Sequence, residues 1–138
     1  MDLEQQLASV PLLAGLEPRV RRRLTEVGKR RNYAAGETIV QQGTTGTALY
    51  IILSGTARVE KADGERLGEL RAGDFFGELA LIEEHPRSAS VMADSETECL
   101  LFPAWEFTAL LEEHPEISIP IMKALIGRLH RREHHVPA

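Results

Sequence analysis

The hydrophobic positions change their spacing twice along the chain. In residues 16–27, and again in residues 104–132, they recur every three or four residues, which is the spacing of one face of a helix. Between these segments, from Gly28 to about Pro103, short runs of β-forming residues alternate with glycines at close intervals. The pattern therefore predicts helices at both ends of the chain and many short strands in the middle.

Local signals indicate where the helices begin and end. Asp2 is a suitable cap for a short first helix, and Pro18 in the first turn opens a second one. A third helix is expected over residues 104–113. The last runs from residue 115 or 118 to about 132, and Pro120 lies either in its first turn or at a kink. Its apolar positions are expected on one face, at Ile121, Leu125, Ile126 and Leu129.

The middle segment is predicted to form a sandwich, barrel or jelly roll, because many short strands are separated by regular turns. Asp63-Gly64 is a tight-turn signal between two of these strands. The expected strands are residues 38–40, 48–53, 56–60, 67–70, 88–92 and 98–102. The fold class is therefore mainly β with flanking α-helices: N-terminal helices, a β-roll (double-stranded β-helix), then C-terminal helices.

Composition limits the classes of function. The 138 residues suffice for a single domain, 1–138, and 43% hydrophobic with 27% charged residues is typical of a globular protein. A net charge of -5 argues against a broad nucleic-acid-binding surface but allows local positive potential for a small anion. Cys99 is the only cysteine, so we expect no internal disulfide and a cytoplasmic location. We find no signal peptide and no stretch of roughly 20 apolar residues, so no membrane contact is expected.

One segment combines the residue types that an anionic ligand requires. It reads Phe75-Phe76-Gly77-Glu78-Leu79-Ala80-Leu81, followed by Pro86-Arg87-Ser88-Ala89-Ser90-Val91. Gly77 allows a close backbone approach, and a short helix over residues 78–82 would aim its first amides at an anion. The planar, charged guanidinium of Arg87 has donors that match a phosphate, and Ser88 adds a hydroxyl donor. The Glu78 carboxylate suits a pair of sugar hydroxyls. An anion with an attached ribose satisfies all of these groups.

Several blocks of this sequence together resemble the cyclic-nucleotide-binding domain family. That family includes regulatory subunits of cyclic-AMP-dependent protein kinase, bacterial catabolite activator proteins and cyclic-nucleotide-gated channels. The resemblance covers nearly the whole chain, and one departure is Gly46-Thr47, where many relatives have glycine-aspartate in a strand turn. The blocks are Pro11 to Leu16, Ala35-Gly36-Glu37 with Gln42-Gly43, Tyr50 to Gly55, Gly73 to Glu78, and Arg87-Ser88-Ala89.

The resemblance implies a role for each matching residue. Glu78 would accept the ribose 2′-hydroxyl, and Arg87 would pair with the cyclic phosphate. The last helix would be a lid. The amides of Leu79, Ala80 and Ala89 would complete the phosphate cradle, Val59 and Leu67 would line the sugar and base, and Leu129, Arg132 and Glu133 would cover the base. The chain then divides into N-terminal helices (1–27), a β-roll (28–103) with a phosphate-binding loop (75–91), and C-terminal helices with the lid (104–135).

The expected ligand is a cyclic mononucleotide, with cyclic AMP favoured over cyclic GMP. In the family a hydroxyl beside the phosphate arginine, here Ser88, can favour guanine, whereas alanine there is common in cyclic-AMP-selective relatives. Bacterial cyclic-AMP sensors also carry serine at this place, which is why we favour cyclic AMP. The expected role is a regulatory sensor module, with no catalytic residue, no metal and no cofactor.

Plainer interpretations exist for the same residues. Glu78 and Arg87 can form a simple ion pair across a surface loop, and Cys99 is interpreted as a small buried residue. Trp105 and Phe107 are interpreted as helix packing. A metal site at the C-terminal histidines is not expected.

Alternative functions make different demands on the sequence. A cupin-type enzyme needs clustered histidines, and none lies between residues 28 and 84. A degenerate family member would bind no nucleotide and act through protein contacts. A transcription regulator of the catabolite-activator type would continue into a helix-turn-helix after the lid, and 138 residues leave no room for one. We therefore expect no direct DNA binding. The expected partner is an effector, either a separate protein (in trans) or a lost part of the same chain (in cis). A homodimer through the C-terminal helix is a further expectation.

Overall fold

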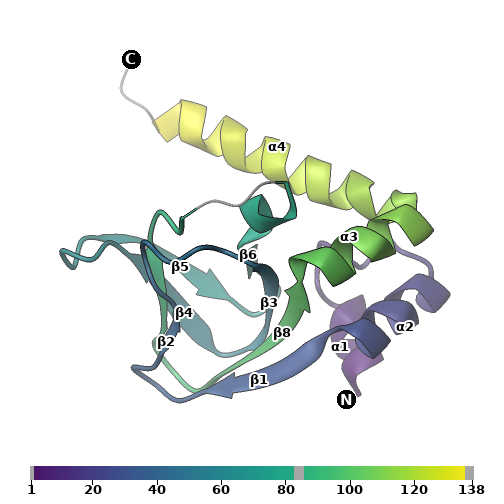
Figure 1. The fold of residues 1–138 in the computed structure, drawn as a ribbon, viewed down its shortest axis with the longest axis horizontal. Coiled ribbons are helices and arrows are strands. Elements are labelled where there is room, and N and C mark those ends of the chain that lie inside the picture. The colour runs from purple at the N-terminus through teal and green to yellow at the C-terminus, as the bar shows by residue number, and fades with distance from the viewer. Residues whose placement is uncertain (1, 83–85, 136–138) are drawn as a thin grey trace.

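Two groups of helices flank a pair of β-sheets (Figure 1). The structure is a computed structural model, and it describes residues 2–82 and 86–135, apart from the side chains of Leu79 and of residues 131–135. The helices are α1 (Leu3–Ala8), α2 (Pro18–Val27), α3 (Ala104–Glu113) and α4 (Ser118–His135), with short 3-10 helices η1 (Glu78–Leu81) and η2 (Pro115–Ile117). The strands are β1 (Lys29–Tyr33), β2 (Thr38–Val40), β3 (Ala48–Ser54), β4 (Thr56–Glu60), β5 (Arg66–Arg71), β6 (Phe75–Phe76), β7 (Ser90–Ala93) and β8 (Thr97–Pro103).

The strands form two antiparallel sheets of four strands each. The first sheet has the order β1-β8-β3-β6, and the second has the order β2-β7-β4-β5. Strands distant in sequence are neighbours in both sheets, so the chain winds back and forth between them as a roll. The predicted fold class, a β-roll with flanking helices, is confirmed.

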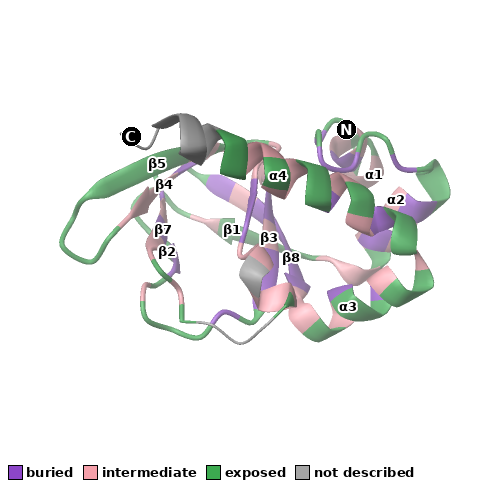
Figure 2. Ribbon diagram, turned by 90° about the horizontal axis from the view of Figure 1, so that it is seen from above, coloured by how far each residue is buried: buried purple, intermediate pink, exposed green. Residues whose placement is uncertain are grey.

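The two central strands of the first sheet are buried on both faces. Leu49 and Leu100 point to a hydrophobic cluster shared with the helices, whereas Ile52 and Cys99 point to a second cluster between the sheets. A strand covered on both faces is a nearly continuous apolar run, which is how β3 and β8 appear in the sequence. Figure 2 shows this buried layer between the helices and the roll.

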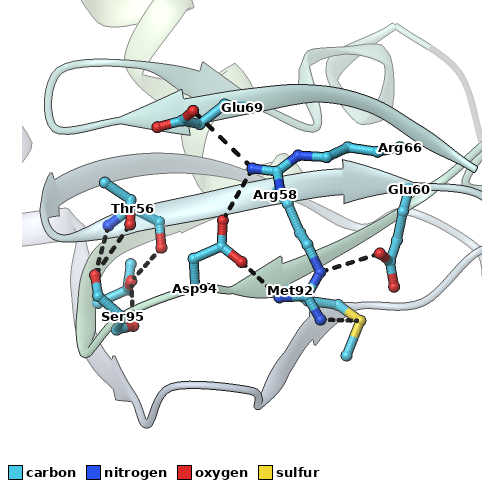
Figure 3. Close-up of polar contacts among 9 residues, drawn as sticks. Thr56, Arg58, Glu60, Arg66, Glu69, Met92, Asp94 and Ser95 are labelled. Atoms are coloured by element: carbon cyan, nitrogen blue, oxygen red, sulfur yellow. Dashed lines mark hydrogen bonds and ion pairs between the residues drawn. The ribbon is translucent and has the colours of Figure 1, made fainter. Parts of the chain in front are cut away.

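The second sheet is buried on one face only. Ala57 and Val59 of β4 point inward, and Arg58 between them points to the outer face, as expected for a period of two. On that outer face Arg58 contacts Asp94 at 2.5 Å and Glu60 at 3.0 Å, and Arg66 contacts Asp94 at 3.2 Å (Figure 3). The ion-pair network therefore covers the outer face of the roll.

Local signals for the helices agree with the structure. The Asp2 carboxylate accepts the amide of Gln5 at 2.8 Å, and the Gln5 side chain accepts the Asp2 amide in return, which makes a capping box. Pro18 begins α2. Pro120 lies in the first turn of α4, which is one of the two positions considered for it.

Four details differ from the sequence predictions. Strand β1 was not predicted, because Lys29-Arg30-Arg31 has no apolar alternation, and it forms by pairing with β8. The short helix expected over residues 78–82 is the 3-10 helix η1, which ends one residue earlier at Leu81, and the strand expected at residue 88 begins at Ser90. Phe107 packs edge-on against Phe102, but Trp105 is 74% exposed and is not a packing residue.

The last helix contacts the rest of the molecule through a different face from the one predicted. Ile121 is buried and Leu125 packs beside it, whereas Ile126 and Leu129 are exposed. The side of α4 toward the roll therefore runs from Ile121 through Leu125 to Arg128. Figure 1 shows α4 extending above η1 and β6. No helix in the described ranges combines the length and the hydrophobicity that crossing a membrane requires.

Candidate functional site

A cavity of about 310 Å³ opens between the two sheets, next to η1 and under α4. Its volume falls at the small end of the range for ligand pockets, roughly 300–1,000 Å³. Apolar side chains form much of its wall, and charged or polar groups gather at Arg87 and Glu78. The lining residues are Val40, Gly46, Val59, Leu70, Phe75, Phe76, Gly77, Glu78, Ala80, Pro86, Arg87, Ser88, Ala89, Val91 and Arg128. Such a cavity suits a small ligand with an apolar body and an anionic group.

Gly77 makes the turn from β6 into the cavity wall. Its φ is +85°, which side-chain-bearing residues rarely adopt. A Cβ atom here would also lie 2.5 Å from the carbonyl oxygen of Ala48. Both conditions require glycine, so the backbone can lie directly against β3 and bring Glu78 to the cavity.

Arg87 lies half-buried at the wall of the cavity. Its Nη2 donates to the Ala48 carbonyl oxygen at 3.4 Å, and its Cζ lies 5.7 Å from the centre of the Tyr50 ring. Tyr50 is itself stacked on Phe76, with ring centres 4.8 Å apart. Burial lowers the pKa of Arg87 from its ordinary value, although Tyr50 and Glu78 oppose that shift. An arginine remains charged after such a shift, so the cavity holds a partly desolvated cation.

Glu78 is paired with a residue of α4. Arg128 Nη1 donates to Glu78 Oε1 at 2.8 Å, and Nη2 donates to the carbonyl oxygen of Phe75 at 2.6 Å. The Arg128 Cζ also lies 4.0 Å from the centre of the Phe75 ring. One arginine therefore joins the last helix to the carboxylate and to the backbone of β6. The ion pair of Glu78 considered from the sequence exists, but its partner is Arg128 and not Arg87.

The other motif residues lie around these two charges. Ser88 and Ala89 line the cavity beside Arg87, and Val59 lines its apolar wall. Ala80 also lines it, but its amide donates to the Gly77 carbonyl oxygen at 3.1 Å. That amide is used inside the turn, which differs from the predicted phosphate cradle. The side chain of Leu79 lies outside the described part of the structure.

Two predicted residues do not reach the cavity, and two others take their places. Leu67 is 49% exposed, and Leu70 lines the cavity instead. Leu70 pairs with the inward-facing Ala57, whereas Leu67 lies at a register shift, between Gly68, which pairs with Val59, and Arg66, which pairs with Glu60. In the same way Leu129 is 56% exposed, whereas Arg128 lines the cavity.

The helical spacing already contained the signal for Arg128. It lies seven residues after the buried Ile121 and three after Leu125, which places all three on one face. The side chains of Arg132 and Glu133, predicted to cover the base, lie outside the described residues. Within the ranges that the structure describes, no group of His, Cys, Asp and Glu side chains has the arrangement of a metal site.

Comparison with known proteins identifies similar sequences and folds. The sequence model of the family described as "Cyclic nucleotide-binding domain" matches residues 30–114. A cAMP-dependent protein kinase regulatory subunit of Aspergillus fumigatus is 43% identical over 94 residues, which are 67% of this chain and 23% of that protein. The chain thus spans about a quarter of the length of this curated relative.

Solved structures show the same architecture. The catabolite activator protein of Thermus thermophilus has a TM-score of 0.81 and 33% identity, over 89% of this chain and 60% of that one. The regulatory domain of Toxoplasma gondii PKA, crystallised with cAMP, has a TM-score of 0.76 and 30% identity, over 88% of this chain and 48% of that one. The arrangement of helices and roll is therefore shared with these proteins.

Proposed function

The chain belongs to the cyclic nucleotide-binding domain family, and we propose that it binds a cyclic mononucleotide in the cavity between Arg87 and Glu78. The observation that carries the proposal is this cavity, where a cation, a carboxylate and apolar walls meet in a volume of about 310 Å³. The proposed role is that of a regulatory sensor without catalysis of its own. The kinase subunit and activator protein that the chain matches support this role.

Arg87 is the proposed partner of the cyclic phosphate. A phosphate drawn into the cavity loses water and needs a fixed cation, and a guanidinium already held by Ala48 and Tyr50 provides one. Ser88 lies beside it and can donate its hydroxyl. The ligand also relieves the unfavourable burial of the Arg87 charge, because it brings the opposite charge to it.

Glu78 is the proposed acceptor for the ribose hydroxyls. A carboxylate has two oxygens and about four lone-pair sites, so Glu78 can keep Arg128 on Oε1 and accept a hydroxyl on the free sites. The base would then lie against the apolar wall formed by Val40, Val59 and Leu70. The predicted contacts from Arg132 and Glu133 stay part of the proposal for the lid, whereas Leu129 is exposed and Arg128 takes its place at the cavity.

Isothermal titration calorimetry with cyclic AMP and cyclic GMP, side by side, tests the function directly. We expect both to bind and cyclic AMP to bind more tightly. The cAMP in the Toxoplasma gondii structure supports cyclic AMP as a ligand. Tighter binding of cyclic GMP would contradict the preference. Binding of neither nucleotide would favour the alternative of a family member that acts through protein contacts alone.

We propose that α4 reports the ligand through Arg128. This side chain joins the helix to Glu78, so a ligand that contacts Glu78 acts on the same group that holds the helix. A ligand shifts such an equilibrium only by its different affinity for the two positions of the helix. Hydrogen exchange should therefore slow in residues 121–133 as well as in residues 77–89 when cyclic AMP is added.

Two truncations separate Arg128 from the rest of the helix end. A chain that ends at Gly127 lacks Arg128 and should bind cyclic AMP more weakly, while the roll stays folded. A chain that ends at His130 keeps Arg128 and serves as the matched control. Equal affinity of both truncated chains, together with exchange that slows only in residues 77–89, would show that the helix is not coupled to the cavity.

The outward face of α4 is the proposed contact surface for a partner. Its exposed apolar residues are Ile119, Met122, Ile126 and Leu129. They recur at steps of three and four, so they form one stripe along the helix. A homodimer through this stripe predicts a doubled mass in light scattering that Ile126→Glu abolishes. If the protein is a monomer at every concentration, the stripe is instead the proposed contact surface for an effector protein.

A further inference from the structure

A segment outside the phosphate-binding motif is paired with the backbone of Arg87. The amide of Gly43 donates to the carbonyl oxygen of Arg87 at 2.8 Å, and the amide of Arg87 donates to the carbonyl oxygen of Thr44 at 2.7 Å. Next to these bonds Thr45 forms an isolated β-bridge with Pro86. The segment that leads into β3 therefore fixes the backbone from which the Arg87 side chain extends.

The same segment also limits the space for the Arg87 side chain. A Cβ atom at Gly46 would lie 3.0 Å from both Cζ and Nε of Arg87, and 3.3 Å from its Nη1. These distances are shorter than ordinary van der Waals contacts of about 3.5–4.0 Å. Gly46 is not among the glycines with positive φ, so its backbone can accept a side chain. What this position requires is empty space.

Other groups bound the guanidinium on further sides. A Cβ atom at Gly77 would lie 2.7 Å from Nη1, so that side is also closely packed. The Ala48 carbonyl oxygen and the Tyr50 ring lie on further sides, at 3.4 Å from Nη2 and 5.7 Å from Cζ. Arg87 thus lies in a narrow slot among these groups, and it lines the cavity.

We infer that Gly46 is a positioning residue for Arg87, because its missing side chain provides the slot that holds the guanidinium at the cavity wall. A side chain at this position requires the guanidinium to move by a few tenths of an ångström, which changes its place relative to the cavity and to the Ala48 carbonyl oxygen. The effect on binding rests on the proposed function, whereas the effect on Arg87 itself does not. From the sequence, Gly46 is expected only in a strand turn, because nothing in the local pattern shows its contact with a residue 41 positions later.

Two substitutions of increasing size test the inference by calorimetry. Gly46→Ala should weaken cyclic AMP binding about threefold, and Gly46→Val about tenfold or more, as a hydrogen bond to a charged group is progressively lost. Gly15→Ala is the matched control, because Gly15 has no positive φ and no atom within 4 Å of an added Cβ. Adenosine, which lacks the phosphate, should bind the parent and the Gly46 variants equally. An equal loss for adenosine and cyclic AMP would overturn the inference.

A measurement on Arg87 itself separates this inference from the proposed function. The Nε–H resonance of Arg87, assigned by its disappearance in Arg87→Lys, should move in Gly46→Ala and stay in place in Gly15→Ala. An unmoved resonance would overturn the inference whatever the nucleotide affinities are. If the resonance moves but the parent protein binds no cyclic nucleotide, the positioning of Arg87 stands and the proposed function fails.

The Arg87→Ala background provides a second check that does not need the larger side chain at position 46. An alanine ends at Cβ, so it has none of the Arg87 atoms that an added Cβ at Gly46 would displace. Gly46→Ala should therefore have no further effect on cyclic AMP binding in that background. This double-mutant cycle tests whether Gly46 acts through Arg87 even if Gly46→Val does not fold. A threefold further loss there would show that Gly46 acts on something other than Arg87.

Discussion

The two charged ends of the cavity are held by different parts of the molecule. Arg87 is held by the roll alone, through the backbone of Thr44 and the carbonyl oxygen of Ala48. Glu78 is held by Arg128, which comes from the last helix 50 residues later in the chain. The difference separates two tasks: the rigid end recognises the ligand, and the end tied to the helix can report it. The following predictions test this separation, from the largest expected effect to the smallest.

Removal of the Arg87 side chain should cause the greatest loss of affinity. We expect Arg87→Ala to weaken cyclic AMP binding by about 2–5 kcal/mol, the range for removing one partner of a buried charged pair. Calorimetry measures the affinity, and circular dichroism should show an unchanged fold. Arg58→Ala on the outer face of the roll is the control for loss of an arginine. If Arg87→Ala binds within threefold of the parent, Arg87 is not the phosphate partner.

The Glu78 end should be sensitive to the sugar. The parent should bind 2′-deoxy cyclic AMP more weakly than cyclic AMP by about 1.5–3 kcal/mol, the usual range for a hydrogen bond to a charged group. Glu78→Gln should reduce this difference, whereas Arg87→Lys should leave it largely unchanged. If the parent binds the two ligands with equal affinity, Glu78 does not accept the 2′-hydroxyl.

Arg128→Ala should free the helix with little effect on the roll. The lost bonds to Glu78 and Phe75 are partly exposed, so we expect α4 to open more easily by about 1–2 kcal/mol. Hydrogen exchange in residues 121–130 should become faster, and exchange in β3 and β8 should not change. Lys123→Ala, an exposed cation on the same helix, is the matched control. Faster exchange in both variants would mean that general helix stability, and not the Glu78 contact, holds α4.

The stability of the fold should also respond to alkaline pH, because a weak acid, Cys99, is buried in the cluster between the sheets. Burial raises the pKa of Cys99 to about 12. The stability that the neutral thiol contributes is present below about pH 9 and is lost as the pH rises toward 12, because only the unfolded chain ionises in that window. Urea unfolding at pH 10 should therefore show a loss of about 1 kcal/mol relative to pH 8. Cys99→Ala should remove most of this change, and an identical pH dependence in that variant would assign it to another group.

Most strands could be predicted because their burial is visible in the sequence. β3 and β8 are apolar runs, and the β4–β5 hairpin has an Asp63-Gly64 turn. β1 could not be predicted in this way. Its five residues are almost all exposed, and hydrogen bonds to β8 specify it rather than its own hydrophobicity.

The site shows the same limit. Arg87 and Glu78 were predicted because they belong to one motif with Gly77, and the structure places all three at one cavity. Helical spacing places Arg128 on the face of Ile121 and Leu125, but its contact with Glu78 also depends on how the last helix crosses the roll, so the residue was missed. Leu67 was chosen over Leu70 although only the sheet register distinguishes their faces.

The edges of the two sheets determine how copies of this chain behave when they meet. An open edge strand offers unpaired backbone groups to any other strand, which is the first step of aggregation. Two of the four edges, β6 and β2, are only two and three residues long. The other two are longer but charged: β1 carries Lys29, Arg30 and Arg31, and β5 carries Arg66, Glu69 and Arg71. Two copies of β1 repel each other edge to edge, so this strand does not template fibrils even when the protein is concentrated.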